Sequence, residues 1–530
     1  MVSEATASTA LEEDSKVSGR AWAILAAMGF GAFIAQMFGS IIANALPQMQ
    51  KDLNLSAGNT TWIASGYFLA FGVGLIAGGR LGDLIGEVKM VVIGYSVFGV
   101  TLITAAIAPD GLVLILSRIG QGLGIGISAP ATLTIVVNSF PVLRRGMAVG
   151  TWGAAHGIGI ALGPILGGAA TDSLGWRYIF WLTVPLDILV IVVTIIACRT
   201  YKSVLAKGSY DVIGLILGGA GVTALVYGLQ ISSAKGWSSP TVIAYLVAAV
   251  ILLIAFYIVE HKVKHPLVDF GLFKERLFSG GFLAEFGIGL VYLPMLTFVG
   301  GFYLITVLGF SPLEAGFVIL PTTGVAALLQ PISGRVMDRF GPGRPIAVGM
   351  ILAGISLFWL TQITPETTFA MLLGPFLIMG VAVSLVLPGG NTAGMLAVDA
   401  KRAGMGAGVL QMAFVLCNGI GIAVVTSMLG SLQSSQLDDL TSGKDYAALA
   451  TQYDALVQSD PASAAKLLAG LPEATQQAIT AAANTAYSTS LGICMGVLGV
   501  VSIVGAVLAY WLIGKRRRPD HIEMTHAAAI

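Results

Sequence analysis

Charged side chains are scarce in this chain. Only 10% of the 530 residues are Asp, Glu, Lys or Arg, whereas about 25% is usual in soluble domains. Hydrophobic residues make up 56% of the chain, and the mean hydropathy is +0.87. The net charge of +1 gives no reason to expect a nucleic-acid partner. This composition excludes an ordinary soluble domain and favours an integral membrane protein.

Cysteines are few and nucleotide-binding loops are missing. Cys198, Cys417 and Cys494 are far apart and form no Cys-x-x-Cys pair, so we expect neither a disulfide framework nor a metal site. No phosphate-binding loop of the Gly-x-x-x-x-Gly-Lys-Ser/Thr type occurs, so we expect no nucleotide cofactor. Residues 1–20 are polar and the first apolar run is long, so we expect no cleavable signal peptide.

Long apolar runs fill most of the chain. A membrane-spanning helix needs about 20 mostly apolar residues. Fourteen runs meet this requirement, the first over 22–46 and the last over 487–514. The connections are short except for 432–486, a polar stretch without a clear hydrophobic core, in which 445–458 and 461–468 could form short amphipathic helices. The sequence predicts an all-α integral membrane protein with fourteen transmembrane helices.

Basic residues are distributed unequally between the two sides of these helices. With an even number of spans, both chain ends lie on one side, and that side collects most of the Lys and Arg residues. The other side has only Lys51, Arg177, Lys235, Lys444 and Lys466. The positive-inside rule therefore predicts cytoplasmic tails over 1–21 and 515–530, and an extracytoplasmic loop over 432–486.

An internal repeat organises the spans. The segment from Gly79 to Gly86 recurs from Gly334 to Gly341, with the glycines, an arginine and an aspartate at matching positions. A second pair of matching segments begins at Arg144 and Arg402. A duplicated hydrophobic unit is typical of two-bundle transporters. We expect six-helix bundles over 22–200 and 277–514, separated by an inserted helix pair and linker over 201–276.

Four motifs in order resemble those of the major facilitator superfamily, and within it the fourteen-helix drug:proton antiporters. They are Ala45-Leu46-Pro47, the Gly79 to Gly86 segment with Lys89, the segment from Leu116 to Gly124 around Arg118, and the segment from Gly159 to Gly168. The resemblance implies a multi-pass transporter of the plasma membrane, not an enzyme. Such a transporter exports hydrophobic or amphipathic small molecules by alternating access, using the proton gradient instead of a cofactor. It also implies small molecules, protons and membrane lipids as partners, and a monomer.

The repeated loop motif suggests a gate between the halves. Asp83 or Asp338 could pair with an arginine or cap a helix N-terminus of the other half, and such a contact would exist only while the cytoplasmic side is closed. The alternative is that both are solvated loop residues. By resemblance, the gating residues are Gly79, Asp83, Gly86, Gly334, Asp338, Arg339 and Gly341.

The fifth span carries the motif that, by resemblance, marks exporters. Pro164 removes one backbone hydrogen bond. The neighbouring glycines leave one helix face without side chains, against which we expect a helix of the other half to pack; generic helix packing is the alternative. The motif residues are Gly159, Gly163, Pro164, Gly167 and Gly168.

Four ionisable side chains lie well inside apolar spans, where each costs roughly 2.5–3.5 kcal/mol. They are candidates for proton coupling: Arg118, His156, Asp187 and Glu285. Glu285, among glycines at the start of the second half, could bind and release a proton, or could lie near the interface and reach water. For Arg118 and His156 the alternative is a hydrogen-bonded structural role, and for Asp187 it is a position on a supporting helix.

The expected substrate cavity is mostly apolar. Relatives carry an acid in the first helix, but residues 37–40 contain none. Weak candidates for the lining, which could equally be packing residues, are Phe38, Trp152, Tyr292, Met295, Phe298, Met412 and Phe414. Two other functions remain open: a dedicated exporter of one endogenous product, such as a lipid or a self-made antibiotic, and a non-transporting sensor that uses 432–486 to bind a ligand.

Overall fold

The computed structural model describes residues 17–42, 45–55, 57–459 and 461–514, and the predicted tails lie largely outside these ranges. The described residues form helices joined by short connections, without strands. The N-terminal half contains α2 (Gly19–Ile41), α3 (Leu46–Asp52), α4 (Ala57–Ile85), α5 (Glu87–Ala106), α6 (Gly111–Ser139), α7 (Arg145–Leu174) and α8 (Arg177–Ala197). An inserted pair follows, α9 (Val212–Lys235) and α10 (Pro240–Lys262). The C-terminal half contains α11 (Arg276–Met295), η4 (Leu296–Val307), α12 (Pro312–Phe340), α13 (Gly343–Trp359), α14 (Phe369–Leu396), α15 (Ala403–Thr441), α16 (Ala447–Ser459), α17 (Pro461–Ala469) and α18 (Glu473–Ile513).

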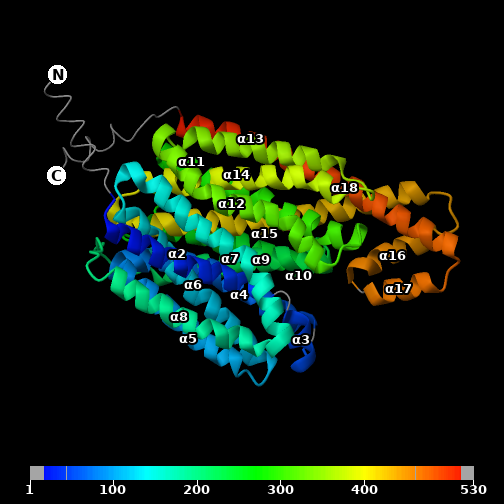
Figure 1. Ribbon diagram of the computed structural model, residues 1–530, viewed down its shortest axis with the longest axis horizontal. Helices are drawn as coiled ribbons and strands as arrows, with labels where there is room; N and C mark the ends of the chain where they lie inside the picture. The colour runs from blue at the N-terminus through cyan, green and yellow to red at the C-terminus, as the bar shows by residue number, and fades with distance from the viewer. Residues whose placement is uncertain (1–16, 43–44, 56, 460, 515–530) are drawn as a thin grey trace.

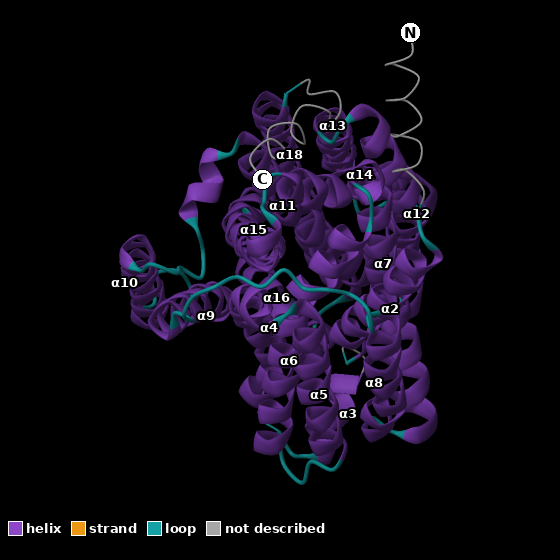
Figure 2. Cartoon of the chain, turned by 90° about the vertical axis from the view of Figure 1, so that its left-hand side faces the viewer, coloured by secondary structure: helices purple, strands orange, loops and turns teal. Residues whose placement is uncertain are grey.

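The two halves meet along two helix pairs. Helix α7 packs against α12, and α4 packs against α15. Because the repeat relates α4 to α12 and α7 to α15, the two seams are equivalent to each other. The inserted helix α9 lies across the second seam, where it contacts both α4 and α15, while α10 packs on α9 (Figure 2). Within the part of the chain that the structure describes, no inserted helix pair covers the first seam.

Fourteen helices of the described chain are long and apolar enough to cross a membrane, which confirms the predicted number. The first predicted span was too long at its end. Helix α2 stops at Ile41, and Leu46 and Pro47 begin the separate helix α3. Proline suits the first turn of a helix because that turn leaves N–H groups unpaired in any case.

The polar stretch 432–486 is a packed helical unit, and the expectation that it has no hydrophobic core was wrong. Helices α15 and α18 extend into it, and α16 and α17 confirm the two predicted amphipathic helices (Figure 1). Leu437, Ala450, Ile479 and Ala486 form a small buried cluster between them. The Nε2 of Gln433 also donates a hydrogen bond to Asp454 at 2.5 Å, which ties α16 to α15.

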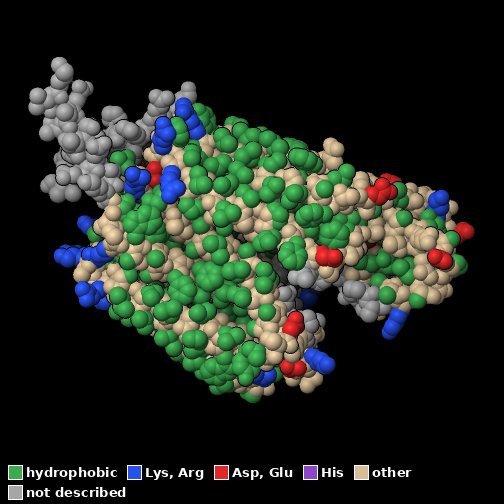
Figure 3. Space-filling model, viewed as in Figure 1, with side chains coloured by type: hydrophobic (Ala, Val, Ile, Leu, Met, Phe, Trp, Pro, Cys, Tyr) green, Lys and Arg blue, Asp and Glu red, His purple; other side chains and the backbone are tan. Residues whose placement is uncertain are grey.

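The surface suits a bilayer. Large apolar side chains are exposed along the spans, among them Ile216 on α9 and Ile251 on α10. Figure 3 shows a wide band of hydrophobic side chains, with Lys and Arg gathered at one end of the bundle and acidic residues toward the other. We call the first the basic end; it holds the start of α2 and the end of α18. Helices α16 and α17 lie at the opposite end.

Candidate functional site

Asp83 at the end of α4 holds the first turn of α15. Its two carboxylate oxygens accept hydrogen bonds from the backbone N–H groups of Gly404, at 2.7 Å, and Met405, at 3.0 Å. The side chain is 1% exposed. A carboxylate at a helix N-terminus satisfies otherwise unpaired N–H groups and is favoured by the helix dipole. This is the helix-capping contact between the halves that the repeat suggested.

Asp338 makes the equivalent contact at the other seam. It accepts hydrogen bonds from Gly146 N at 2.7 Å and Met147 N at 2.9 Å, in the first turn of α7. We call these two contacts the Asp83 clamp and the Asp338 clamp. Both join the halves at the basic end, so the described conformation is closed there.

The glycines of the repeated motif make each clamp possible. A Cβ added at Gly79 or Gly334 would collide with the backbone of the partner helix, at Gly404 or Gly146. The last glycines, Gly86 and Gly341, have φ of 102° and 77°, values that only glycine adopts readily, and each ends its helix. Arg339, by contrast, is exposed and stacks on Phe340 instead of joining the clamp.

The predicted packing of the exporter motif was wrong. Gly159, Gly163 and Gly167 face α2 of the same half, where a Cβ would meet backbone atoms of Phe33, Met37 and Ile41. Pro164 lies inside α7, which runs on to Leu174, and Gly168 is only partly buried. A different set of glycines, nearer the start of α7, forms the seam to the other half, because a Cβ added to any of them would contact α12. They are Gly146, Gly150, Gly153 and Gly157. Helix α7 therefore has two glycine faces, and the motif occupies the one inside its own half.

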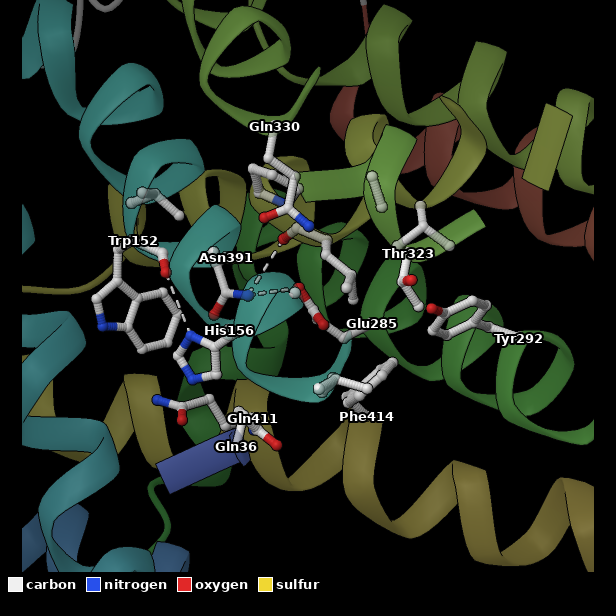
Figure 4. Close-up of a pocket in the computed structure, with 18 residues that line it drawn as sticks. Gln36, Trp152, His156, Glu285, Tyr292, Thr323, Gln330, Asn391, Gln411 and Phe414 are labelled. Atoms are coloured by element: carbon white, nitrogen blue, oxygen red, sulfur yellow. Dashed lines mark hydrogen bonds between the residues drawn. The ribbon is translucent and has the colours of Figure 1, made fainter. Parts of the chain in front are cut away.

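A cavity of about 120 Å³ lies between the halves. Helices α2 and α7 line it from the N-terminal half, and α11, α12, α14 and α15 from the C-terminal half (Figure 4). Among the predicted residues it brings together His156, Glu285, Trp152, Tyr292 and Phe414. Its polar wall also contains Gln36, Thr323, Gln330, Asn391 and Gln411.

Glu285 is the one acidic side chain that the described residues place on this wall. It is 1% exposed, and its Oε1 accepts a hydrogen bond of 2.7 Å from Asn391 Nδ2. It lies nine residues into α11, or about 14 Å from the start of that helix at 1.5 Å per residue. The carboxylate is therefore enclosed well inside the span in this conformation. A Cβ at Gly390 would lie 2.7 Å from Oε1, so the glycine leaves room for the carboxylate between α11 and α14.

Several polar atoms around the cavity have no hydrogen-bond partner within the described structure. They are Nε1 of Trp152, Oε1 of Gln330, Oδ1 of Asn391 and Nε2 of Gln411. His156 lies nearby, with its ring 4.1 Å from that of Trp152 and Nδ1 3.3 Å from Trp152 O. A buried unpaired donor or acceptor costs about 1–3 kcal/mol. Water or a ligand that brought both donors and acceptors would relieve this cost.

Arg118 and Asp187 lie elsewhere in the N-terminal half. Arg118 Nε donates to Ile63 O at 3.0 Å, NH1 donates to Gln121 Oε1 at 3.0 Å, and the guanidinium lies over the Tyr67 ring at 4.4 Å. These contacts match the structural alternative for Arg118. Asp187 is 2% exposed and packs at Gly99 of α5, away from the cavity wall.

Four predicted lining residues are not on the cavity wall, so their expected position was wrong for this conformation. Phe38 is fully buried against Phe98 and Phe180. Met295 and Phe298 pack inside the C-terminal half. Met412 of α15 packs against the core cluster built mainly from the N-terminal half. Aromatic and Met side chains fill helix interfaces as readily as cavities, so their residue type does not reveal which they line.

The sequence analysis did not predict the uncharged polar residues of the wall, because a charged group inside an apolar span is the more conspicuous signal. Gln36 directly precedes the stretch 37–40 in which an acid was expected, and Asn391 follows Pro388, Gly389 and Gly390 in α14. Uncharged amides inside apolar spans are also costly and need partners. Amide side chains inside apolar spans were therefore the sequence feature that could have identified this wall.

Comparison with known families decides the relationship. The sequence model of the Major Facilitator Superfamily matches residues 28–209 and 210–422. The chain belongs to the Major Facilitator Superfamily. The solved structure of the human organic anion transporter MFSD10 (TETRAN) superposes with a TM-score of 0.58, covering 93% of this chain and 100% of that one. At 13% sequence identity this likeness shows the fold alone.

Curated superfamily members resemble the chain more closely. It is 30% identical to the tetracenomycin C resistance and export protein of Streptomyces glaucescens, over 96% of this chain and 94% of that protein. It is also 30% identical to the puromycin resistance protein pur8 of Streptomyces alboniger, over 79% and 84% of the two chains. The multidrug resistance protein Stp of Mycobacterium tuberculosis is 30% identical over 78% and 77%.

Proposed function

We propose that this superfamily member exports hydrophobic or amphipathic small molecules in exchange for protons, by alternating access. The observation that carries the proposal is a cavity between two halves that are held shut at one end by two equivalent clamps. Release of both clamps would open the cavity toward the basic end. The proton gradient is the energy source, and a monomer provides the whole pathway.

The basic end faces the cytoplasm in this proposal. Lys and Arg gather there (Figure 3), and the positive-inside rule assigns such an end to the cytoplasm. The α16–α17 unit then lies outside the cell membrane. The described conformation is closed to the cytoplasm.

Glu285 carries the proton in this proposal. The carboxylate accepts the 2.7 Å hydrogen bond from Asn391, so the pair links α11 to α14 when the proton is absent. A proton on Glu285 removes the charge from a site deep in the membrane, where charge is costly. Proton binding and release therefore change the favoured arrangement of helices around the cavity.

The substrate is a largely neutral molecule with hydrogen-bonding groups. The cavity offers aromatic surface from Trp152, Tyr292 and Phe414, and the unpaired amide and indole atoms next to it. A lipophilic dication would need more than one buried carboxylate, because an unpaired buried charge is costly. The resistance and export function in the names of the relatives supports drug-like or antibiotic-like substrates.

Two alternatives keep some support. The names of the tetracenomycin and puromycin relatives are equally compatible with a dedicated exporter of one self-made antibiotic. One objection to a sensor was that residues 432–486 have no hydrophobic core, and the buried cluster in this segment removes that objection. A non-transporting sensor, however, would not need two equivalent contacts that hold the halves together at one end.

Transport by purified protein in proteoliposomes tests the proposal. A substrate is first identified by resistance of an efflux-deficient host to a panel of neutral and cationic toxic compounds. We expect Glu285→Gln to abolish uptake driven by an imposed pH gradient but to retain exchange of labelled for unlabelled substrate. The matched control is Glu366→Gln, at an exposed acid. Wild-type gradient-driven rates in Glu285→Gln between about pH 6 and 8 would make Glu285 structural, and His156 or Asp187 would be tested next.

A further inference from the structure

Two acidic side chains are buried where the inserted helix pair begins and ends. Asp211 directly precedes α9 and is 8% exposed, and Glu260 lies two residues before the end of α10 and is 4% exposed. Figure 2, which faces the basic end, shows α9 and α10 side by side next to α15. Nothing in the transport cycle proposed above uses these two acids.

Each carboxylate binds a backbone N–H group with only one of its two oxygens. Asp211 Oδ1 accepts a hydrogen bond from Gly214 N at 2.8 Å, and Glu260 Oε2 accepts one from Val268 N at 3.3 Å. The other two oxygens, Asp211 Oδ2 and Glu260 Oε1, are buried and have no hydrogen-bond partner within the described structure. A Cβ added at Gly214 would lie 2.7 Å from Asp211 Oδ2 and 2.6 Å from Glu260 Oε1. Both unpaired oxygens therefore point into the same small space.

This arrangement is unfavourable while both carboxylates are ionised. Two like charges that share a site out of water repel each other, and an ionised carboxylate can only accept hydrogen bonds. One added proton removes the repulsion and makes one of the two unpaired oxygens a donor to the other. Such a pair holds one proton as a unit.

The charged groups around the pair also favour one proton. Arg80 of α4 is 4% exposed, and its charge acts on both Glu260 and Asp83. Its Nε has no hydrogen-bond partner in the described structure, and it forms no ion pair with a described acid. The N-terminus of α15 already binds the Asp83 carboxylate, and α15 carries no charged residue before Asp438. One buried arginine against the two carboxylates of the pair leaves one negative charge in excess, which one proton neutralises. Within five residues of the pair along the chain, the other titratable side chains are Lys207, Tyr210, Tyr257, His261, Lys262, Lys264 and His265.

We propose that Asp211 and Glu260 bind one proton between them, as a proton site separate from Glu285. The proton comes from water at the basic end, bonds to one of the two facing oxygens and is donated in a hydrogen bond to the other. Its release to water restores two carboxylates. The bound proton ties the start of α9 to the end of α10.

The proton site is connected to the Asp83 clamp. Glu260 holds Val268, and the next residue, Asp269, pairs with Arg402 at 2.6 Å. The backbone N–H of Asp269 also donates to Met405 Sδ at 3.2 Å, and Met405 is one of the two residues that Asp83 binds. Helix α9 itself packs on both α4 and α15. Loss of the proton should therefore loosen the connection between α10 and α11 and weaken the brace across this seam.

Infrared difference spectroscopy of the full chain tests the proton site, because a protonated carboxylic acid has a carbonyl band that a carboxylate lacks. The measurements use a Glu285→Gln background, so that Glu285 does not contribute. Between about pH 5 and about pH 9, we expect a carboxylic acid band that is lost as the pH rises. Asp211→Asn and Glu260→Gln should each remove this band, because the amide NH₂ donates to the remaining carboxylate in place of the proton. The matched control is Glu275→Gln, at an exposed acid on the same side of the protein, which should leave the band unchanged.

Distances between spin labels at residues 262 and 401 test the connection to the clamp. Lys262 ends α10 and Lys401 precedes α15, and both are exposed. With the native cysteines replaced, we expect one distance at low pH and a second, longer one that grows as the pH rises. The ratio of the two populations should change by about tenfold per pH unit at most, because one proton is exchanged. Asp211→Asn and Glu260→Gln should keep the short distance at every pH, and Glu275→Gln should respond to pH as the wild type does.

The outcomes separate the possible explanations. A carboxylic acid band that is equally strong in wild type and both amide variants would overturn the proton site. A wild-type distance that does not depend on pH would overturn the connection to the clamp. If no acid band is found and the short distance at fixed pH needs sodium or potassium instead of choline, the pair binds a metal cation and the proton assignment is wrong. Neither measurement uses a substrate, so failure here leaves the exporter proposal standing, and the reverse also holds.

Discussion

Loss of the Asp83 clamp should open the basic end of the transporter. Asp83 makes two hydrogen bonds, at 2.7 and 3.0 Å, to the N-terminus of a helix in the other half, and it is almost fully buried. Asn retains one carbonyl acceptor but loses the charge, and its NH₂ group cannot accept from the second N–H. The net contribution of a hydrogen bond to a charged group is about 1.5–3 kcal/mol. We therefore expect Asp83→Asn to destabilise the closed conformation by about 2 kcal/mol.

This loss applies to the closed conformation alone, because water can satisfy the carboxylate when the halves separate. A difference of about 2 kcal/mol changes the closed-to-open ratio about 30-fold. A population that favours the closed form by about 30 to 1 would become about evenly divided. The equivalent variant Asp338→Asn should have a similar effect. The two clamps join different helix pairs, so the double variant should shift the ratio by roughly the product of the single effects.

Distances between spin labels at residues 89 and 401 provide the assay. Lys89 lies on α5 and Lys401 precedes α15, both exposed at the basic end and in opposite halves. The three native cysteines are buried and would first be replaced. Asp83→Asn should add a second, longer distance, while Glu366→Gln should not. A single unchanged distance in both clamp variants would refute the assignment of these aspartates as clamps.

Three further predictions concern packing, selectivity and topology. Gly150→Ala places a Cβ against Gln330 O across the seam and should open the basic end without lowering the thermal midpoint of unfolding, whereas Gly163→Ala collides with Ser40 inside one half and should lower that midpoint. Gly316→Ala, with free space around it, is the control, and equal behaviour of all three variants would contradict two separate glycine faces on α7. Export of matched neutral, monocationic and dicationic compounds should favour neutral ones, because the cavity wall has one acid; preferential resistance to dications would show that another acid binds them. Cysteines at Ser434 and Ser203 should label from opposite sides of the membrane, and labelling of both by an impermeant reagent from outside would overturn the topology.

The sequence by itself determined the number of spans, the duplicated halves and the presence of an inserted pair. Burial in a bilayer requires a long apolar segment at every crossing, and this requirement acts on each segment separately, so composition reveals it. The repeat also located Asp83 and Asp338 correctly at helix ends. An arginine, a helix N-terminus of the other half and solvent were all possible partners for these carboxylates, and the structure shows that the partner is the helix N-terminus.

Only the tertiary structure decided which helix face meets which neighbour. The glycines of α7 look alike in sequence, yet Gly163 approaches α2 and Gly150 approaches α12. Arg118 and Glu285 are both ionisable groups deep in apolar spans, but one is enclosed by carbonyls and aromatic rings and the other lines a cavity. Chemistry and spacing show that such a residue needs a partner. The relative rotation of the helices, set by many contacts between segments distant in the chain, decides whether that partner is protein, substrate or proton.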